Sequence, residues 1–486
     1  MPLTWTELLN QLRRADLLVS APERGPAVTG LGVDSRTVVP GSAYLAVRGS
    51  ESDGHRFVPE AVKRGAAAVI VESAQRSGLP EVVVRDGRRA AVVLGSAWYD
   101  YPARRLELIG VTGTNGKTTT TSLLRHLLNH SGTAGSIGTL GAFDGRGEAV
   151  PSTAGSLTTP GPIDLQATFA DLAARGVTQV AMETSSHSLD QGRLDGLSFA
   201  AALFTNLTRD HLDYHGTMDA YLAAKLKLSG LLAVGGVEVV NLDDEAWQAI
   251  EPRLPRVTFG LGPRADVRAS EIAMDASGSR FCLAGRFGAA DVHLPLLGDF
   301  NVANALAAGA CALAIGRPLQ EVAERLGGSP QVPGRMERIA ETPCIVLRDY
   351  AHTPDALERA LATLRPLTPG RLILVFGCGG DRDQGKRPLM GAIGARLADI
   401  AIVTSDNPRT EDPEAILDDI EQGMEGLPHR RIVDRLQAIH AALNEGRAGD
   451  TILLAGKGHE TYQILGTTRV EFDERKIVRQ AVNGER

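Results

Sequence analysis

Short apolar runs alternate with polar turns along the first hundred residues of the chain. The runs are GSAYLAV (41–47), AAAVIVE (66–72) and PEVVVRD (80–86). Apolar runs of this length, bounded by turn-forming residues, are typical of buried strands. The N-terminal stretch MPLTWTELLNQLRRADLL instead has the spacing of a short amphipathic helix and lacks the pattern of a signal peptide. We therefore expect a small α/β domain over residues 1–105.

A second alternation begins with the apolar run Leu106–Val111, which leads into a glycine-rich loop and then into a helical pattern of leucines. Further strands are predicted at 177–183, 199–207 and 236–245, and their carboxyl ends carry polar or acidic residues. Open α/β sheets bind ligands at that edge. The alternation of strands and helices predicts a mainly parallel sheet in a central domain over residues 106–333.

Four more apolar runs follow, in segments that begin at positions 344, 371, 398 and 450. Each run is succeeded by Gly, Asp or Asn and then by a helical pattern, an order typical of doubly wound folds. We therefore predict a C-terminal Rossmann-like domain over residues 334–486, and an α/β fold class with three domains.

The composition excludes several functional classes. A chain of 486 residues is too long for one core. Its net charge of -7 argues against nucleic-acid binding, which requires a basic surface. The four cysteines form no CxxC pair, so neither a disulfide framework nor a zinc site is expected. No apolar run is long enough to span a membrane. We expect a soluble cytoplasmic protein that holds anionic ligands with local loops and individual cations.

The segment GVTGTNGKTTT (110–120) lies between a predicted strand and a predicted helix, the context that a phosphate loop requires. Its backbone N–H groups would converge on phosphate oxygens, Lys117 would neutralise them, and the Thr118 hydroxyl would join a Mg²⁺ shell. Val111 stands where the general spacing has a glycine. The alternative is a glycine-rich turn without a ligand. We predict that the central domain binds a nucleoside triphosphate, with contacts at Gly113, Thr114, Asn115, Gly116, Lys117, Thr118 and Thr119.

This loop, in order with METSSHSLDQGR, FTNLTRDHLDYHGTMDAYLAAK, LLGDFNVANALAA, PGRMERI and DYAHTPDALE, resembles the Mur ligase family of ATP-dependent amide-bond-forming enzymes. The resemblance extends from VDSRTVVPGSAYLAVRG to LLAGKGHETYQI and is greatest to the tripeptide-forming branch. It implies that a carboxylate of UDP-N-acetylmuramoyl-L-alanyl-D-glutamate attacks the γ-phosphate of ATP. An amine then attacks the resulting acyl phosphate, in a step of peptidoglycan precursor synthesis. We expect the protein to be a monomer.

The resemblance also implies a metal site and four catalytic residues. Mg²⁺ would be bound by Thr118, Glu183, His211 and a carbamylated Lys225. The catalytic residues would be Lys117, Glu183, His211 and Lys225. From the residues alone, Glu183 could cap a helix, His211 could be a solvated loop residue and Lys225 a surface lysine. Carbamylation needs a neutral amine, and burial lowers the pKa of a lysine.

The remaining nucleotide and substrate contacts are likewise implied by matching positions. Asn301 would lie near the adenine, and Arg335 and Asp349 would contact the nucleotide; an interdomain salt bridge is the alternative for Arg335. The nucleotide-sugar peptide would be held by Val33, Ser35, Ser50, Glu51, Ser52, Thr158, Thr159, Ser185, Gln191 and Arg193. Leu157 replaces an asparagine found in some relatives, so no role is assigned to it.

The segment DNPR (406–409) matches the motif for meso-diaminopimelate as the incoming amino acid. Diaminopimelate carries an additional carboxylate that lysine lacks, and arginine offers it a paired-donor fork. The expected contacts are Arg382, Asp406, Asn407, Pro408, Arg409, Gly456 and Glu460. On local grounds the same segment is only a strand-end turn with a solvated arginine.

Three other functions stay open at this point. The nearest is the lysine-adding form of the same enzyme, against which DNPR counts. The second is folylpolyglutamate synthetase, which shares the phosphate loop but is disfavoured by the N-terminal VDSR segment and by DNPR. The third is a nucleotide-binding regulator without catalysis, which the presence of Lys117, Glu183, His211 and Lys225 disfavours.

Overall fold

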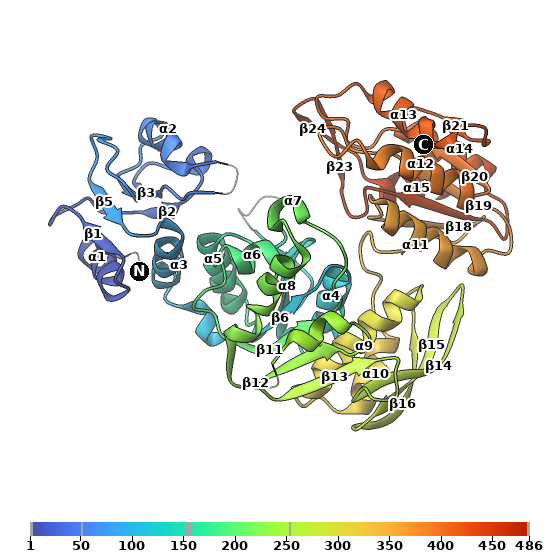
Figure 1. Ribbon diagram of the computed structural model, residues 1–486, viewed down its shortest axis with the longest axis horizontal. Coiled ribbons are helices and arrows are strands. Elements are labelled where there is room, and N and C mark those ends of the chain that lie inside the picture. Colours follow the sequence, from blue (N-terminus) through green and yellow to red (C-terminus); the bar gives the residue numbers. More distant parts are fainter. Residues whose placement is uncertain (1–2, 50–51, 152–156, 252–253, 484–486) are drawn as a thin grey trace. The chain divides into compact units, whose positions relative to one another are not determined.

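The computed structural model describes residues 3–49, 52–151, 157–251 and 254–483. The chain forms two compact units. The first comprises Met1–Arg268, Ala284–Ala289 and Asn304–Val322; the second comprises Ala269–Leu283, Ala290–Ala303 and Ala323–Arg486. Their helices and strands are labelled in Figure 1.

The N-terminal part of the first unit is a five-stranded sheet in the order β1-β5-β4-β3-β2, parallel except for the β1–β5 pair. A capping box of Thr4 and Glu7 starts the predicted N-terminal helix, whose leucines Leu8, Leu9 and Leu12 are buried. The elements are α1 (Trp5–Arg14), β1 (Leu18–Ser20), β2 (Gly30–Gly32), β3 (Ser42–Leu45), α2 (Val58–Lys63), β4 (Ala68–Val71), β5 (Glu81–Val84) and α3 (Gly87–Trp98), with short 3₁₀ turns at Ser35–Thr37, Gly54–Phe57 and Pro102–Arg105.

The second sheet of the first unit is mainly parallel, as the sequence predicts. Its parallel strands lie in the order β14-β13-β12-β11-β6-β10-β7, and β8 and β9 extend it as antiparallel strands. Leu108, Val180 and Phe199 from three strands pack with Phe169 and Leu172 of α5 in one core. The strands are β6 (Glu107–Thr112), β7 (Ala134–Gly138), β8 (Gly141–Phe143), β9 (Ala149–Val150), β10 (Gln179–Glu183), β11 (Phe199–Phe204), β12 (Leu232–Asn241), β13 (Arg256–Gly260) and β14 (Val267–Asp275).

The helices around this sheet include α3, which lies beside α5 and so joins the N-terminal sheet to the central one (Figure 1). The remaining elements up to residue 327 are α4 (Lys117–Leu128), α5 (Pro162–Ala174), α6 (Ser186–Asp190), α7 (Leu212–His215), α8 (Met218–Leu226), β15 (Gly278–Gly285), β16 (Gly288–Leu294), α9 (Asp299–Ala314) and α10 (Leu319–Gly327), with 3₁₀ turns at Ser229–Leu231 and Glu245–Ala249.

The register of the central sheet brings the candidate chemistry to one edge. Glu183, the last residue of β10, lies opposite Val111 of β6, and Phe204 of β11 lies opposite Thr112. Because these strands are parallel, their carboxyl ends and the loops that follow them meet at this edge.

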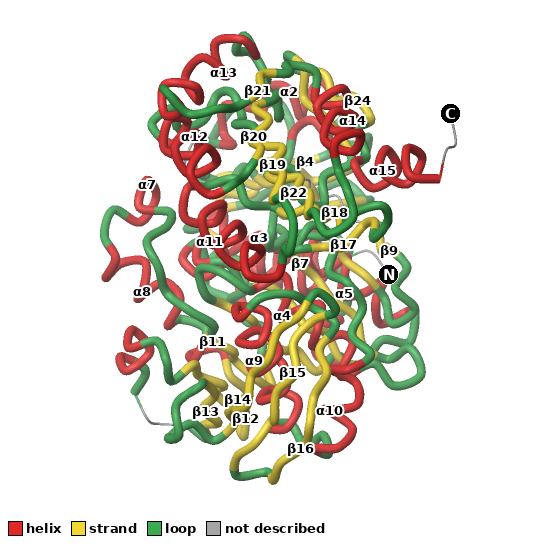
Figure 2. The backbone as a smooth tube through the Cα atoms, turned by 90° about the vertical axis from the view of Figure 1, so that its right-hand side faces the viewer, coloured by secondary structure: helices red, strands yellow, loops and turns green. Residues whose placement is uncertain are grey.

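The C-terminal part of the second unit is doubly wound. Its six-stranded sheet has the order β17-β18-β22-β19-β20-β21, and only the β17–β18 pair is antiparallel. Leu372, Leu374 and Phe376 of β19 pack against α11–α13, whereas the intervening Ile373 and Val375 pack against α14 and α15. Figure 2 shows α12 and α13 on one side of these strands and α14 and α15 on the other.

The elements of this part are β17 (Glu337–Ala340), β18 (Ile345–Asp349), α11 (Pro354–Leu364), β19 (Leu372–Phe376), α12 (Lys386–Leu397), β20 (Ile400–Val403), α13 (Pro413–Glu421), β21 (Arg430–Arg431), α14 (Arg435–Glu445), β22 (Thr451–Ala455), β23 (Tyr462–Leu465), β24 (Thr468–Glu471) and α15 (Glu474–Asn483), with 3₁₀ turns at Arg365–Leu367 and Gln422–Met424. β23 and β24 form a separate antiparallel hairpin that the sequence analysis did not predict.

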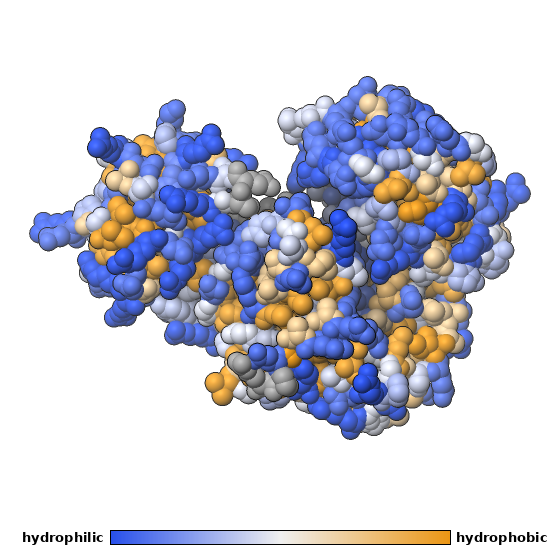
Figure 3. Space-filling view, viewed as in Figure 1, coloured by the Kyte–Doolittle hydropathy of each residue, from blue (hydrophilic) through white to orange (hydrophobic). Residues whose placement is uncertain are grey.

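The side of the molecule shown in Figure 3 is mostly hydrophilic, with smaller apolar areas among the polar ones. Among the helices of the described residues, none combines the length and the apolar character needed to cross a bilayer.

Candidate active site

The predicted phosphate loop connects β6 to α4 and is hydrogen-bonded to the segment that follows β11. Thr114 N donates to Asn206 O at 2.7 Å, and Asn115 N donates to Asn206 Oδ1 at 2.8 Å. Gly113 has a φ of 144°, and a Cβ there would lie 1.9 Å from Thr205 Oγ1. Only glycine allows so close an approach to β11. The loop backbone is therefore fixed at the start of α4, where its N–H groups favour an anion.

The two predicted catalytic lysines both donate to the carbonyl oxygen of Gly113. Lys117, the first residue of α4, donates from Nζ to Gly113 O at 3.0 Å and to Thr114 O at 2.7 Å. Lys225, in α8, donates from Nζ to Gly113 O at 2.6 Å. The structure thus joins α8 to the phosphate loop through its lysine.

The Lys225 side chain is buried, so the alternative of a surface lysine is wrong. Its Nζ lies 4.3 Å from the centre of the Tyr221 ring. Burial lowers the pKa of the Lys225 ammonium well below its ordinary value, and the positive charge of Lys117 lowers this pKa further. The site therefore favours the neutral amine, the form that can react with CO₂.

Glu183 is a buried carboxylate with neutral partners. Thr139 N donates to its Oε1 at 2.8 Å, and Thr139 Oγ1 donates to its Oε2 at 3.1 Å. Gly138, at the end of β7, makes room for it, because a Cβ there would lie 2.3 Å from Glu183 Oε1. Glu183 does not cap the following helix, whose N-cap is Ser185. Among the described residues, Glu183 forms no salt bridge, and a buried carboxylate of this kind is suited to a bound cation.

His211 lies at the start of α7 in a left-handed backbone conformation, with a φ of 51°. Its Nε2 is 3.5 Å from Asp210 Oδ2, and burial lowers the pKa of its imidazole. Its ring centre lies 4.8 Å from that of His187, a residue to which the sequence analysis gave no role.

His187 also contacts Tyr214 and His215, with ring centres 4.3 and 5.4 Å apart. Burial and the neighbouring histidines lower the pKa of His187 to about 4, so its ring is neutral at pH 7. The residue lies in the METSSHSLDQGR segment, but only the fold brings it to His211.

The donor set fits a magnesium site, although no group of three His, Cys, Asp or Glu side chains in the described ranges is arranged to hold a metal by itself. Magnesium prefers oxygen ligands and keeps several of its waters. The Thr118 hydroxyl, the Glu183 carboxylate and a carbamate on Lys225 would supply oxygens, so the modification would convert a neutral amine into an anionic ligand.

A pocket of about 570 Å³ lies between the N-terminal sheet and the central part of the first unit. Its lining includes five of the residues predicted to hold the nucleotide-sugar peptide: Val33, Ser35, Ser52, Gln191 and Arg193. Ser35 donates to Glu60 Oε2 at 3.1 Å. Ser50 and Glu51 lie outside the described residues. The fold thus brings segments more than a hundred residues apart together around one cavity.

Thr158, Thr159 and Ser185 link the pocket to the candidate metal site. Arg193 Nη1 donates to Thr159 O at 3.1 Å, and Thr159 Oγ1 donates to Glu183 O at 2.9 Å. Ser185 N donates to Thr159 Oγ1 at 3.1 Å. The Thr158 hydroxyl lies 3.2 Å from that of Thr139, which donates to the Glu183 carboxylate.

Sequence reasoning missed several residues that line this pocket: Tyr44, Arg48, Phe57, Arg88 and Leu157. Arg88 Nε donates to Arg48 O at 3.0 Å, so its guanidinium is held at the wall beside the start of α3. Leu157 lines the pocket although the sequence analysis set it aside. No motif marks these residues, and only the packing of α3 against the central part reveals them.

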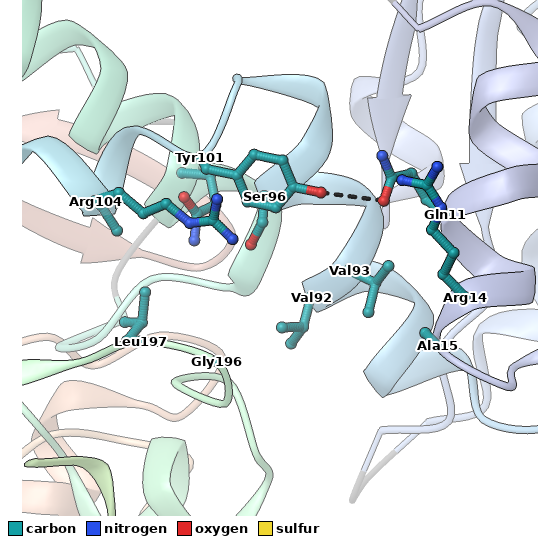
Figure 4. Close-up of a pocket in the computed structure, with 12 residues that line it drawn as sticks. Gln11, Arg14, Ala15, Val92, Val93, Ser96, Tyr101, Arg104, Gly196 and Leu197 are labelled. Carbon is teal, nitrogen blue, oxygen red and sulfur yellow. Dashed lines mark hydrogen bonds between the residues drawn. The ribbon is translucent and has the colours of Figure 1, made fainter. Parts of the chain in front are cut away.

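A second cavity, of about 330 Å³, is also bordered by α3 (Figure 4). Arg104 lies over the Tyr101 ring, 4.2 Å from its centre, and Tyr101 OH donates to Gln11 Oε1 at 3.0 Å. Val92 lines both cavities. None of the predicted substrate residues that the structure describes borders this second cavity.

Three predicted ATP contacts lie in the second unit. Asn301 is buried in α9, and its Nδ2 donates to Leu297 O at 2.7 Å. Arg335 lies over the Tyr350 ring, 4.9 Å from its centre. The Asp349 carboxylate accepts from Met336 N at 2.6 Å and from Ala351 N at 2.8 Å; burial raises its pKa, and the charge of Arg335 opposes that rise.

The predicted amino-acid site occupies the loops that follow β19, β20 and β22. Arg409 has a φ of 53° and donates from Nη1 to Gly380 O at 2.8 Å. A Cβ on Gly379 would lie 2.9 Å from Arg409 Nη1 and 3.9 Å from Arg382 Cγ, so both arginines pass over this glycine. The guanidinium of Arg409 and the aliphatic part of the Arg382 side chain therefore approach the same glycine.

Two acids and an amide lie beside these arginines. Asn407 Nδ2 donates to Glu460 Oε2 at 2.9 Å, and a Cβ on Gly456, whose φ is 112°, would lie 2.7 Å from Asp406 Oδ2. Pro408 connects Asn407 to Arg409 and is buried. The turn thus gathers cationic and anionic groups in one place, which suits an amino acid with both charges.

Models of known protein families match three parts of the chain. Family models match at residues 27–99 (Mur ligase family, catalytic domain), 111–312 (Mur ligase middle domain) and 334–458 (Mur ligase, glutamate ligase domain). The UDP-N-acetylmuramoyl-L-alanyl-D-glutamate--2,6-diaminopimelate ligase of Geobacillus kaustophilus is 46% identical over 469 residues, which cover 94% of this chain and 95% of that protein.

A solved structure of a ligase with the same name matches with a TM-score of 0.67 and 34% identity, over 100% of this chain and 99% of that one. Folylpolyglutamate synthase of Mycobacterium tuberculosis matches with a TM-score of 0.62 but only 19% identity, over 75% of this chain and 92% of that one, which shows a shared fold alone. The ordered motifs, the three family matches and the identity over nearly the whole chain agree, and the chain belongs to the Mur ligase family.

Proposed function

We propose that the chain is an ATP-dependent ligase that adds meso-diaminopimelate to UDP-N-acetylmuramoyl-L-alanyl-D-glutamate in the cytoplasmic synthesis of peptidoglycan precursors. A carboxylate oxygen of the dipeptide attacks the γ-phosphorus of ATP, and the bond between that phosphorus and the bridging oxygen of ADP breaks. The amine of the amino acid then attacks the acyl carbon of the acyl phosphate. The tetrahedral intermediate expels inorganic phosphate, and the amine nitrogen loses a proton.

The first step needs an anionic carboxylate beside an anionic triphosphate, so positive charge and fixed geometry are the main requirements. The phosphate loop supplies N–H groups, and Lys117 supplies a cation at its edge. Lys117 can release the loop carbonyls it now contacts and turn to the phosphates. The pocket between the N-terminal and central parts holds the nucleotide-sugar peptide through Ser35, Gln191 and Arg193.

Thr118, Glu183, His211 and a carbamate on Lys225 would hold magnesium. When bound, magnesium neutralises charge on the phosphate oxygens and orients them. The carbamate forms when the neutral Lys225 amine attacks CO₂: an N–C bond forms and the nitrogen releases a proton. The low pKa of Lys225 supports this modification, because a protonated amine has no free electron pair.

The incoming amino acid is selected in the C-terminal domain. Arg409 and Arg382 lie over Gly379 and would take the carboxylate that lysine lacks, while Glu460 and Asp406 would take an ammonium group. When lysine enters instead, the arginine cation is left without its carboxylate, which costs several kcal/mol.

The observation that carries the proposal is the hydrogen-bonded connection from Arg193 in the pocket through Thr159 to Glu183 at the edge of the phosphate loop. This connection joins the pocket proposed to hold the carboxylate substrate to the phosphate loop and metal site proposed to activate it.

The test uses nucleotide-sugar dipeptide whose D-glutamate carboxylate oxygens carry ¹⁸O. With ATP and meso-diaminopimelate, we expect one labelled oxygen to appear in the released inorganic phosphate, because the acyl phosphate loses that oxygen when the amide forms. Omission of the amino acid serves as the control. ADP release without label transfer would contradict the acyl phosphate, and the absence of ADP release with every amino acid would favour a regulator without catalysis.

A further inference from the structure

The hairpin β23–β24 contacts the loop that carries the proposed amino-acid contacts. Arg409 N donates to Ile464 O at 3.1 Å, and Gly466 N donates to Arg409 O at 2.8 Å. Ile464 N donates to Asn407 Oδ1 at 3.0 Å. The hairpin therefore holds the backbone of Arg409 in its left-handed conformation, which non-glycine residues rarely adopt without support.

Lys457 contacts the same loop, and the proposed reaction assigns it no role. Its side chain is 0% exposed. Its Nζ donates to Asn407 Oδ1 at 3.1 Å and to Glu460 Oε2 at 3.1 Å, and lies 5.8 Å from the centre of the Tyr462 ring. A fully buried lysine is rare unless it is paired, and this one is paired with two of the residues proposed to bind the amino acid.

The resulting triangle leaves defined groups for a ligand. Lys457 and Asn407 both donate to Oε2 of Glu460. Within the described residues, the other carboxylate oxygen, Oε1, accepts no hydrogen bond. Asn407 Oδ1 accepts from both Lys457 and Ile464, which fixes the orientation of the amide. The cation thus sets the direction of an acid and of an amide without needing to touch the ligand.

We propose that Lys457, together with the β23–β24 hairpin, is a positioning residue that orients Asn407, Arg409 and Glu460 for the incoming amino acid. This inference rests on the proposed function. Without the ammonium, Glu460 loses its charged partner and the Asn407 amide loses one of two donors, so both can turn away from the ligand. Amino-acid binding should suffer, while the nucleotide and the nucleotide-sugar peptide, which use other residues, should bind as before.

The test compares Michaelis constants for the three substrates in the full-length protein. Lys457→Met removes the charge and keeps most of the side-chain length, and we expect it to raise the KM for meso-diaminopimelate about tenfold or more. The KM values for ATP and for the nucleotide-sugar dipeptide should change less than about twofold. Lys476→Met is the control, because Lys476 is an exposed lysine of α15 whose ion pair is with Glu471, the last residue of β24.

A second variant covers the case in which Lys457→Met does not fold. Gln463 Nε2 donates to Asp406 O at 2.8 Å from a partly exposed position in the hairpin, so Gln463→Ala should fold and still raise the KM for the amino acid about threefold. An unchanged KM for the amino acid in the folded variants would overturn the inference, as would an equal rise in all three constants. Wild-type protein that forms no product with any amino acid would instead overturn the proposed function, and this inference with it.

Discussion

Lys225 shows how a single residue changes meaning when its surroundings are known. By its position in a helical pattern it is an ordinary surface lysine, yet its Nζ is buried against Gly113 O and the Tyr221 ring. Desolvation by burial, followed by repulsion from Lys117, lowers the pKa of its ammonium. A lysine in this state costs stability when it is protonated, and this gives a signature that can be measured without activity.

The sign of that signature follows from proton linkage. In the unfolded chain the Lys225 amine is protonated up to about pH 10, whereas in the fold it is neutral at lower pH. Unfolding therefore takes up a proton, and the free energy of unfolding rises with pH between the folded and unfolded pKa values. In CO₂-free buffer, the free energy of unfolding of wild type should rise relative to that of Lys225→Met by up to about 1.4 kcal/mol per pH unit between pH 8 and pH 10.

Denaturant unfolding of both proteins at the two pH values measures this difference. Lys225→Met is the reference for all other titrating groups, because the two proteins have these groups in common. A difference in unfolding free energy that stays constant or falls as the pH rises would show that the Lys225 pKa is not lowered in the fold.

At the scale of elements, the carboxyl ends of β6, β7 and β10 determine the position of the Glu183 carboxylate. β7 ends at Gly138, where any side chain would overlap the Glu183 carboxylate. The loop after β7 then returns Thr139, whose N–H and hydroxyl bind both carboxylate oxygens. The position of this acid therefore depends on a glycine and a threonine in a neighbouring strand and loop.

Gly138→Ala should accordingly impair catalysis more than folding. The added methyl group would displace a buried carboxylate by the order of 1 Å, and we expect kcat to fall about tenfold to a hundredfold. The KM for the amino acid should change little, because that site is built from other loops. Gly230→Ala is the matched control, since a Cβ at Gly230 has no neighbour within 4 Å.

Steady-state kinetics of the two variants, with circular dichroism to confirm folding, measure this effect. A Gly138→Ala protein with wild-type kcat would show that Glu183 tolerates displacement and does not hold a reacting group.

At the scale of the whole molecule, the alternation of strands and helices predicted much of the fold. The apolar runs become the strands of three sheets, and the predicted mainly parallel central sheet and doubly wound C-terminal part are both present. The β23–β24 hairpin was missed because YQIL and TRVE are short strands, one mostly half-buried and the other exposed, and neither has a buried face. A polar hairpin of this kind gives almost no hydrophobic signal.

The candidate site was predictable to the extent that motifs carried it. The phosphate loop could be read from local spacing, and the resemblance supplied the role of DNPR together with Glu183, His211 and Lys225. Lys457, His187 and Arg88 could not be found in this way, because their roles come from contacts between segments far apart in sequence. Such contacts follow from topology rather than from periodicity.

We propose that this molecule forms an amide bond with meso-diaminopimelate and selects it through Arg409. The most direct measurement gives the enzyme ATP, UDP-N-acetylmuramoyl-L-alanyl-D-glutamate and an equimolar mixture of meso-diaminopimelate and L-lysine, and identifies the products by mass spectrometry. We expect the diaminopimelate product to exceed the lysine product about a hundredfold or more with wild type, and this excess to fall by at least tenfold in Arg409→Ala. Equal amounts of the two products from wild type, or a larger amount of the lysine product, would contradict the proposed selection of meso-diaminopimelate.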